Sequence, residues 1–208
     1  MEQRSAVTET GLRWACASRP MAGELQCGDR CYVGRRFAAL VDGLGHGPKA
    51  RDAADAIVEL LARRDRREDS LVELFSAAHR EARSTRGAAM TALCYDIEAG
   101  FARWIGVGNV EAICIRREGR GRTSSKRLVP SGGIVGYRLP ELHRSEFQFG
   151  RTDTLILVTD GVRDDFETGL LVGANPKNVA QQIAPQYGAE TDDAAALVCR
   201  PERGDDGG

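Results

Sequence analysis

The sequence predicts an α+β fold in which helices cover two stacked, mainly antiparallel β-sheets. Roughly ten strand-like runs are separated mostly by tight turns, and short links of this kind join antiparallel neighbours. Three segments have helical periodicity, which is too few to cross over between many parallel strands. Two of these helices follow the third strand together and one lies near the end, which suits helices packed outside two stacked sheets.

The length and composition of the chain limit the possible functions. A chain of 208 residues usually forms one unit with a substantial core. We therefore expect a single domain over residues 1–200 and a disordered polar tail over residues 201–208. The formal net charge of -1 gives no basic surface for nucleic acid. No run is long enough to span a membrane and the N-terminus lacks the apolar segment of a signal peptide, so we expect a cytoplasmic protein.

Two early strands are predicted to form a hairpin that brings two acidic residues together. The runs at residues 30–33 and 37–41 are separated only by a tight turn at Gly34. Asp29 precedes the first run and Asp42 ends the second. In an antiparallel pair these positions lie at the same end, so the two carboxylates become neighbours.

A glycine-rich turn follows Asp42. It contains Gly43, Gly45 and Gly47 and leads to Pro48, which suits the first turn of a helix. A buried strand thus ends in a carboxylate within a turn that has few side chains. A hard cation could be held there by the carboxylate and a nearby carbonyl. The alternative is a plain strand-to-helix turn in which Asp42 is only a local cap.

Helical spacing of apolar residues predicts two consecutive helices after this turn. The first covers residues 50–61 and the second residues 71–82. Ser70 and Glu73 match a capping box at the start of the second helix. The charged linker at residues 63–69 between them is interpreted as solvated surface.

The remainder of the chain has mainly strand patterns. Gly108-Asn109 is a two-residue hairpin signal, Asn175 caps a last helix, and Pro185 should end that helix. One further strand, at residues 12–18, precedes the hairpin formed by residues 30–33 and 37–41. The other predicted strands cover residues 90–97, 101–107, 110–116, 127–129, 142–149, 154–159 and 194–199.

The six cysteines favour buried or incidental thiols over a disulfide framework or a zinc site. Four lie inside apolar strand-like runs, where free cysteine behaves as a small hydrophobic residue: Cys16, Cys94, Cys114 and Cys199. Cys27 and Cys31 are four positions apart, and no second pair matches them as zinc ligands.

Four aspartates lie at strand ends beside a glycine or a second acid. They are Asp29, Asp42, Asp160 and Asp192. Magnesium and manganese prefer carboxylates, carbonyls and water, and no histidine pair or cysteine cluster competes for a softer metal. The alternative is four unrelated turn residues, because aspartate is common in turns.

An ordered set of motifs resembles the metal-dependent protein phosphatases, and within them the bacterial SpoIIE-type branch of the protein phosphatase 2C fold, closest to the stressosome phosphatases. The resemblance covers residues 27–199. The motifs are Gly28-Asp29, Val41-Asp42-Gly43-Leu44-Gly45-His46-Gly47, Arg86-Gly87-Ala88-Ala89-Met90-Thr91, Val107-Gly108-Asn109-Val110, Thr159-Asp160-Gly161 and Asp192-Asp193. The resemblance implies a compact four-layer α-β-β-α sandwich with metals at one edge of the two sheets.

The resemblance also implies two divalent cations, manganese or magnesium, and a role for each ligand. Asp42 would bridge both metals and Gly43 would contribute its carbonyl. Asp160 and Asp192 would complete one metal site, and Asp29 would serve the other directly or through water. Asp42, Asp160 and Asp192 are the expected catalytic residues.

Several positions are assigned less directly. Asp193 matches a position that is often asparagine in the family, so we place it behind the ligands. His46 could protonate the leaving oxygen, or it is only a turn residue near a helix start. Arg19 is a loose candidate for the phosphate-binding arginine of eukaryotic members, against a solvated surface arginine. Ala195 stands where the family usually has threonine, and the chain has no room for a large substrate flap.

The implied reaction is hydrolysis of phosphoserine or phosphothreonine by a hydroxide that bridges the two metals. The implied partners are phosphorylated STAS-domain proteins of a bacterial stress-signalling pathway, either a stressosome scaffold or an anti-sigma-factor antagonist. We expect a monomer that binds neither nucleic acid nor membrane. Two alternatives remain open: a catalytically weak phosphatase-fold binding module, and a nucleotide-binding protein that uses the loop at residues 43–47. That loop lacks the Gly-Lys-Ser/Thr ending of a phosphate loop.

Overall fold

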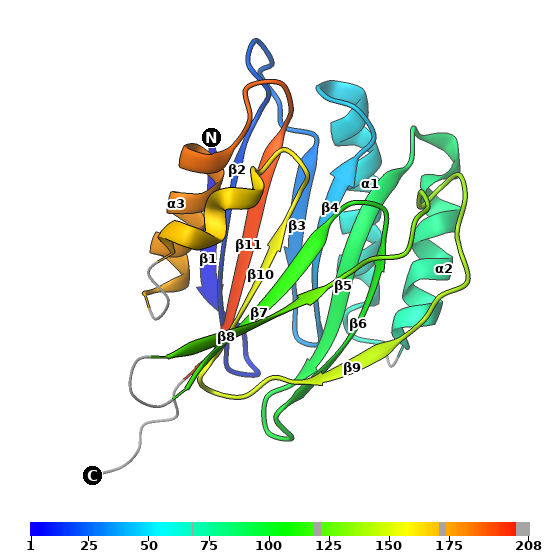
Figure 1. Cartoon of the computed structure of the whole chain (residues 1–208). Helices are drawn as coiled ribbons and strands as arrows, with labels where there is room; N and C mark the ends of the chain where they lie inside the picture. The colour runs from blue at the N-terminus through cyan, green and yellow to red at the C-terminus, as the bar shows by residue number, and fades with distance from the viewer. Residues whose placement is uncertain (68, 119–121, 171–173, 203–208) are drawn as a thin grey trace.

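Two β-sheets packed face to face, with helices on both outer faces, form the architecture of the protein (Figure 1). The structure is a computed structural model that describes residues 1–67, 69–118, 122–170 and 174–202. Its four α-β-β-α layers confirm the fold class predicted from many tight turns and few helices. None of the helices in these ranges has the length and apolar character needed to span a bilayer.

The first sheet has six strands in the order β1-β2-β11-β10-β7-β8, and every neighbouring pair is antiparallel. The strands are β1 (Glu2–Val7), β2 (Leu12–Arg19), β7 (Glu111–Arg117), β8 (Thr123–Leu128), β10 (Asp153–Val158) and β11 (Ala194–Pro201). All six residues of β10 are buried, as expected for the apolar run predicted as a central strand. Helix α3 (Pro176–Tyr187) packs on β2 and β11.

The second sheet has five antiparallel strands in the order β3-β4-β5-β6-β9. The strands are β3 (Asp29–Val33), β4 (Phe37–Gly43), β5 (Ala88–Asp96), β6 (Phe101–Val107) and β9 (Ser145–Gln148). Helices α1 (Pro48–Arg64) and α2 (Leu71–Glu81) cover its outer face. The predicted capping box at Ser70 and Glu73 is present at the start of α2.

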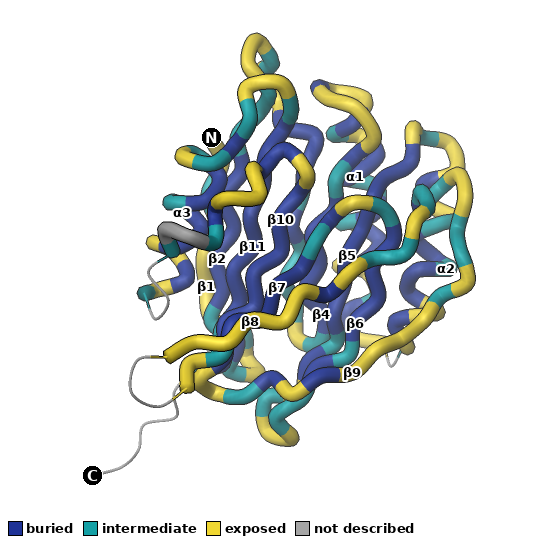
Figure 2. The backbone as a smooth tube through the Cα atoms, viewed as in Figure 1, coloured by how far each residue is buried: buried dark blue, intermediate teal, exposed yellow. Residues whose placement is uncertain are grey.

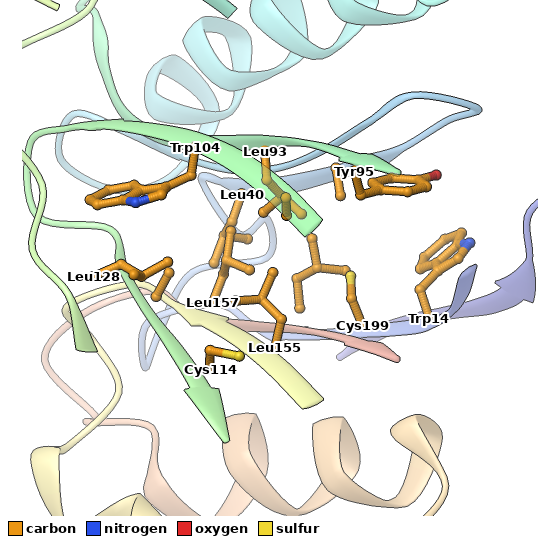
Figure 3. Close-up of a cluster of buried hydrophobic side chains, with 14 of the residues drawn as sticks. Trp14, Leu40, Leu93, Tyr95, Trp104, Cys114, Leu128, Leu155, Leu157 and Cys199 are labelled. Carbon is orange, nitrogen blue, oxygen red and sulfur yellow. The ribbon is translucent and has the colours of Figure 1, made fainter. Parts of the chain in front are cut away.

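The core has one layer between the sheets and one layer beneath the helices on each side. Trp14, Leu40 and Leu157 belong to the inner layer, where side chains of the two sheets meet (Figure 3). Phe37 and Phe75 are fully buried between the second sheet and its helices. Each such side chain stabilises the fold by about 1.5–3 kcal/mol. The central strands are accordingly buried along most of their length, whereas the edge strands β1, β8 and β9 are largely exposed (Figure 2).

Three of the expectations about individual elements were wrong. The Gly108-Asn109 link is not a hairpin, because β6 belongs to the second sheet and β7 to the first. Pro185 lies inside α3, which continues to Tyr187. The strand β1 was not predicted, because its exposed side chains give no apolar alternation.

The charged linker between α1 and α2 is not entirely solvated surface. Asp65 is buried, and its carboxylate accepts hydrogen bonds from the backbone N–H groups of Arg35 and Arg36, at 2.8 and 3.4 Å. It therefore ties the end of α1 to the turn between β3 and β4.

The predicted tail begins later than residue 201. Pro201 ends β11 and is buried, and Glu202 forms an ion pair with Arg13. The remaining tail residues lie outside the described ranges.

The cysteines are all free, and five of the six are buried. Cys16, Cys31, Cys114 and Cys199 belong to the inner layer of the core. Their positions inside β2, β3, β7 and β11 agree with the interpretation of these residues as small hydrophobic side chains.

Candidate active site

The ends of four strands meet at one edge of the sandwich and bring the acidic residues together. Asp29 and Asp42 are direct partners in the β3–β4 register, as the hairpin argument predicted. Asp160 follows β10, and Asp192 and Asp193 precede its antiparallel neighbour β11, so these three lie at one end of the first sheet. This edge is therefore shared by both sheets.

Hydrogen bonds join the two sheets directly at this edge. Thr159 Oγ1 donates to Asp29 Oδ2 at 2.8 Å and accepts from the N–H of Ala195 at 2.9 Å. The N–H of Gly28, just before β3, donates to Asp193 Oδ2 at 2.7 Å. Residues from β3, β10 and β11 are thus fixed relative to one another by contacts between buried groups.

Asp29 is almost fully buried, and this controls its protonation. Burial raises the pKa of Asp29 to about 8, with the hydrogen bond from Thr159 opposing the shift and the charges of Asp193, Asp192 and Asp160 adding to it. Without a cation, Asp29 therefore holds a proton at neutral pH.

Asp42 has a similar environment although it is only half-buried. Burial raises the pKa of Asp42 to about 9, and the negative charges of Asp29, Asp160, Asp192 and Asp193 add to the shift. These neighbouring charges are all negative, so none of them favours the ionised form of Asp42.

Asp160 and Asp192 are more open to solvent than Asp29. The side-chain amide of Asn109 donates to Asp160 Oδ2 at 2.5 Å, which fixes the orientation of that carboxylate. Asp192 accepts a hydrogen bond from the N–H of Asp193 at 2.8 Å. Burial raises the pKa of Asp192, with the charges of Asp160 and Asp193 adding to the shift, while that hydrogen bond and nearby His46 oppose it.

Asp193 has the role of an anchor. Its two carboxylate oxygens each accept a backbone hydrogen bond of 2.7 Å, one from Met21 and one from Gly28. It therefore holds both ends of the loop that connects β2 to β3. Both carboxylate oxygens of Asp193 are thus occupied by backbone N–H groups.

Two glycines allow the backbone to pack closely around the aspartates. A Cβ atom at Gly43 would lie 1.9 Å from the carbonyl oxygen of Ala50, and one at Gly161 would lie 1.9 Å from that of Asp193. Any larger residue would push the β4–α1 turn or the β10 end away from its neighbour. Packing alone therefore accounts for these glycines, without a bound nucleotide.

His46 and Arg19 have different surroundings. His46 Nδ1 lies 2.8 Å from Glu24 Oε1, and the ring remains half-exposed close to Asp192. The guanidinium of Arg19 donates through Nη2 to the carbonyl of Ala189, and its Nε is buried without a hydrogen-bond partner among the described residues.

Sequence reasoning missed the parts played by Asn109 and Glu24. Asn109 lies within the Val107-Gly108-Asn109-Val110 motif, but the sequence pattern there indicates only a hairpin turn. Glu24 has no local signal, because its partner His46 is distant in the chain. Only the folded loop places the two together.

The sequence matches the family model described as stage II sporulation protein E over residues 33–202. The chain belongs to the SpoIIE family. The matched range contains Asp42, Asp160 and Asp192, and it leaves out Asp29. A search of curated proteins found no match.

Solved structures with the same fold are similar to this chain over most of its length. A chain solved in work on the bacterial stressosome is 28% identical with a TM-score of 0.79, over 91% of this chain and 99% of that one. RsbX in complex with magnesium is 19% identical with a TM-score of 0.80, over 97% and 100%. The catalytic domain of the serine/threonine phosphatase PstP with two manganese ions is 16% identical with a TM-score of 0.69, over 92% and 99%.

The two less similar structures show the fold alone. The family match and this shared fold place the SpoIIE-family chain in the enzyme class of protein serine/threonine phosphatases. The resemblance seen in the ordered motifs is thereby confirmed at the level of family and fold.

Proposed function

We propose that the protein is a metal-dependent phosphatase that hydrolyses phosphoserine or phosphothreonine on STAS-domain proteins of a bacterial partner-switching pathway. The observation that carries this proposal is the convergence of Asp29, Asp42, Asp160 and Asp192 at one edge of both sheets. The relatives from the stressosome study and RsbX support the choice of pathway.

The residues at this edge fit hard divalent cations. Their donors are carboxylates and the backbone carbonyl of Gly43, which magnesium and manganese prefer. The pKa values of about 8 for Asp29 and about 9 for Asp42 reflect burial first, with the negative charges of the neighbouring carboxylates adding to the shift. A divalent cation would displace their protons and stabilise the ionised forms. Asp42, Asp29, Asp160, Asp192 and the carbonyl of Gly43 would hold the cations.

The chemistry that the cations supply when bound is activation of water and neutralisation of charge on the phosphoryl oxygens. The protein itself provides the positioning. Thr159 holds Asp29 and Asn109 holds Asp160, so each carboxylate is oriented before any ligand arrives. His46 binds Glu24 through Nδ1, which leaves Nε2 as the atom that would give a proton to the leaving oxygen.

A phosphatase assay with purified protein tests this function. We expect phosphate release from a phosphorylated STAS domain and from p-nitrophenyl phosphate in manganese or magnesium, and none in excess chelator. Asp42→Asn should lower the rate at least about a hundredfold, because a cation ligand is removed at the reacting centre. Asp52→Asn is the matched control, since Asp52 is exposed on α1.

The same assay separates the alternatives. A protein that binds the phosphorylated STAS domain but shows no metal-dependent turnover would be a binding module. Nucleotide titration that gives tight binding, together with an inactive wild type, would favour the nucleotide-binding alternative.

A further inference from the structure

The candidate site has an excess of negative charge at the place where a phosphate must bind. Five carboxylates act on one another there: Asp29, Asp42, Asp160, Asp192 and Asp193. Two divalent cations would bring four positive charges against these five negative ones. A phosphomonoester dianion would therefore gain from a cationic side chain that can reach its oxygens.

Most cationic side chains around this edge already have partners. His46 pairs with Glu24, and Arg127 pairs with Glu111 and Glu167, so a phosphate would have to break these contacts before it could use either side chain. Arg19 donates through Nη2 to the carbonyl of Ala189, and its Nε, which has no partner among the described residues, is buried, so that atom is not open to a phosphate in this structure.

Arg86 is placed at the site by the β4–β5 register. Gly43 pairs with Ala88, and beyond the strands the N–H of Leu44 donates to the carbonyl of Gly87 at 3.0 Å. Continuation of this register brings Arg86 opposite Gly45, three residues after Asp42. Gly45 lies in the turn that directly follows β4, so Arg86 stands beside the turn that carries the chain away from Asp42.

The guanidinium of Arg86 lies against the glycine-rich turn and is open to a ligand. A Cβ atom at Gly45 would lie 3.0 Å from Arg86 Nη1, so the bare backbone of Gly45 makes room for the guanidinium. Arg86 is exposed, and within the described ranges its side chain has no hydrogen-bond or ion-pair partner.

The backbone on both sides of Arg86 is fixed. The N–H of Gly87 donates to Thr85 Oγ1 at 3.0 Å, and Thr85 Oγ1 donates to the carbonyl of Ala82 at 2.7 Å. Ala88 and Val135 exchange two backbone hydrogen bonds of 2.9 and 2.8 Å. The side chain therefore leaves a rigid base, and little backbone entropy is lost when it engages a ligand.

We propose that Arg86 is the phosphate-binding side chain of this site, where its guanidinium contacts the non-bridging oxygens of the phosphoserine or phosphothreonine substrate. The planar fork of arginine matches two phosphate oxygens at once. The inference rests on the proposed phosphatase function and adds a substrate-binding residue outside the acidic cluster.

The test compares wild type with Arg86→Lys, Arg86→Ala and Arg83→Ala. Arg83 is the matched control, because it is exposed on the short 3-10 helix (Ala82–Ser84) that precedes Arg86. Loss of a charge-assisted contact should raise KM and lower kcat/KM for p-nitrophenyl phosphate about 10- to 100-fold in Arg86→Ala. Arg86→Lys should be intermediate, because lysine keeps the charge and loses the fork.

Binding of inorganic phosphate to the magnesium-loaded protein provides a readout that does not depend on turnover. Calorimetry should show weaker phosphate binding in Arg86→Ala by the same factor, with magnesium affinity unchanged. Equal phosphate affinity in wild type and Arg86→Ala would overturn the inference, and so would an equal loss in the control Arg83→Ala. An inactive wild type that binds phosphate through Arg86 would contradict the phosphatase function alone.

Discussion

At the scale of single residues, the site is a set of carboxylates held close together against their mutual repulsion. Asp29 is fixed by Thr159, and Asp193 by the N–H groups of Met21 and Gly28. The Asp42 carboxylate accepts no hydrogen bond from the residues that the structure describes, and its pKa is raised to about 9 by burial and by neighbouring negative charges. The metal-free protein therefore stores unfavourable electrostatic energy that protons or cations can relieve.

This arrangement predicts that the metal-free protein loses stability as the pH rises. An unfolded aspartate titrates near its ordinary pKa, about 3.9, whereas Asp29 and Asp42 titrate at about 8 and about 9 in the fold. Between these values the folded state binds more protons, so its stability falls from about pH 4 until both groups have ionised. In excess chelator, the Tm should be higher at pH 6 than at pH 8.

Asp42→Asn is the control for this prediction. The substitution removes one titrating group, so the Tm of the metal-free variant should be higher than that of wild type at pH 8 and should depend less on pH. Identical pH profiles for the two proteins would show that Asp42 does not carry the raised pKa.

At the scale of elements, side chains at strand and helix ends determine how the pieces meet. Asp160 follows β10 and Asp192 precedes β11, and the antiparallel pairing of these strands places both at one edge. Asp65 directly follows the C-terminal end of α1, and it holds the β3–β4 turn by accepting hydrogen bonds from two backbone N–H groups of that turn. The edge aspartates and Asp65 therefore differ in function although all are acids at element ends.

Asp65→Ala should lower the free energy of unfolding by about 1–3 kcal/mol, because two backbone N–H groups lose their buried acceptor. Metal binding should be unchanged. Urea denaturation measures the effect, with Asp52→Ala on the exposed side of α1 as the control, expected within about 0.5 kcal/mol of wild type. Equal stability of the two variants would contradict the anchoring role.

Asp160→Ala and Asp192→Ala should each weaken metal-dependent activity without adding. Residues that serve one ion act as a unit, so the double variant should be scarcely worse than either single one. The measurement is kcat/KM at a fixed manganese concentration for all three variants. Losses that multiply would mean that the two carboxylates serve different ions.

The sequence predicted most strands because their apolar runs are bounded by glycine and acidic turns, and it predicted the Asp29–Asp42 contact because a hairpin is local. The Gly108-Asn109 link was wrongly predicted to be a hairpin, because the pairing of the strands on either side of it is not local. A turn pattern shows that the chain reverses, but the sheet that the next strand joins depends on distant partners such as β10. The anchoring by Asp193 and Asn109 also needed the assembled fold.

At the level of the whole molecule, three exposed apolar side chains lie on loops that are tied to the candidate site. Leu25 is 97% exposed, Leu44 47% and Val129 75%. Leu25 lies in the loop anchored by Asp193, and Leu44 follows the Asp42-Gly43 pair. Val129 lines a cavity of about 300 Å³ that Asp160 also borders. A folded partner could contact several of these loops at once, whereas a short peptide could contact few of them.

A folded substrate should therefore be preferred over a peptide of the same sequence. We expect kcat/KM for an intact phosphorylated STAS domain to exceed that for its excised phosphopeptide by about tenfold or more, because the peptide must also lose conformational freedom. Leu25→Ser should reduce the rate on the domain and leave p-nitrophenyl phosphate hydrolysis unchanged. Equal kcat/KM values for domain and peptide would confine recognition to the phosphate and its immediate neighbours.

The proposed phosphatase requires that carboxylates from both sheets form one divalent-cation centre with Asp42 as the shared ligand. Calorimetric titration of the chelator-treated protein with manganese tests it most directly, in wild type, Asp42→Asn and the control Asp52→Asn. We predict two binding events in wild type and in Asp52→Asn, and loss or marked weakening of both in a folded Asp42→Asn protein. Unaltered manganese binding by Asp42→Asn, or no binding by wild type, would contradict the account.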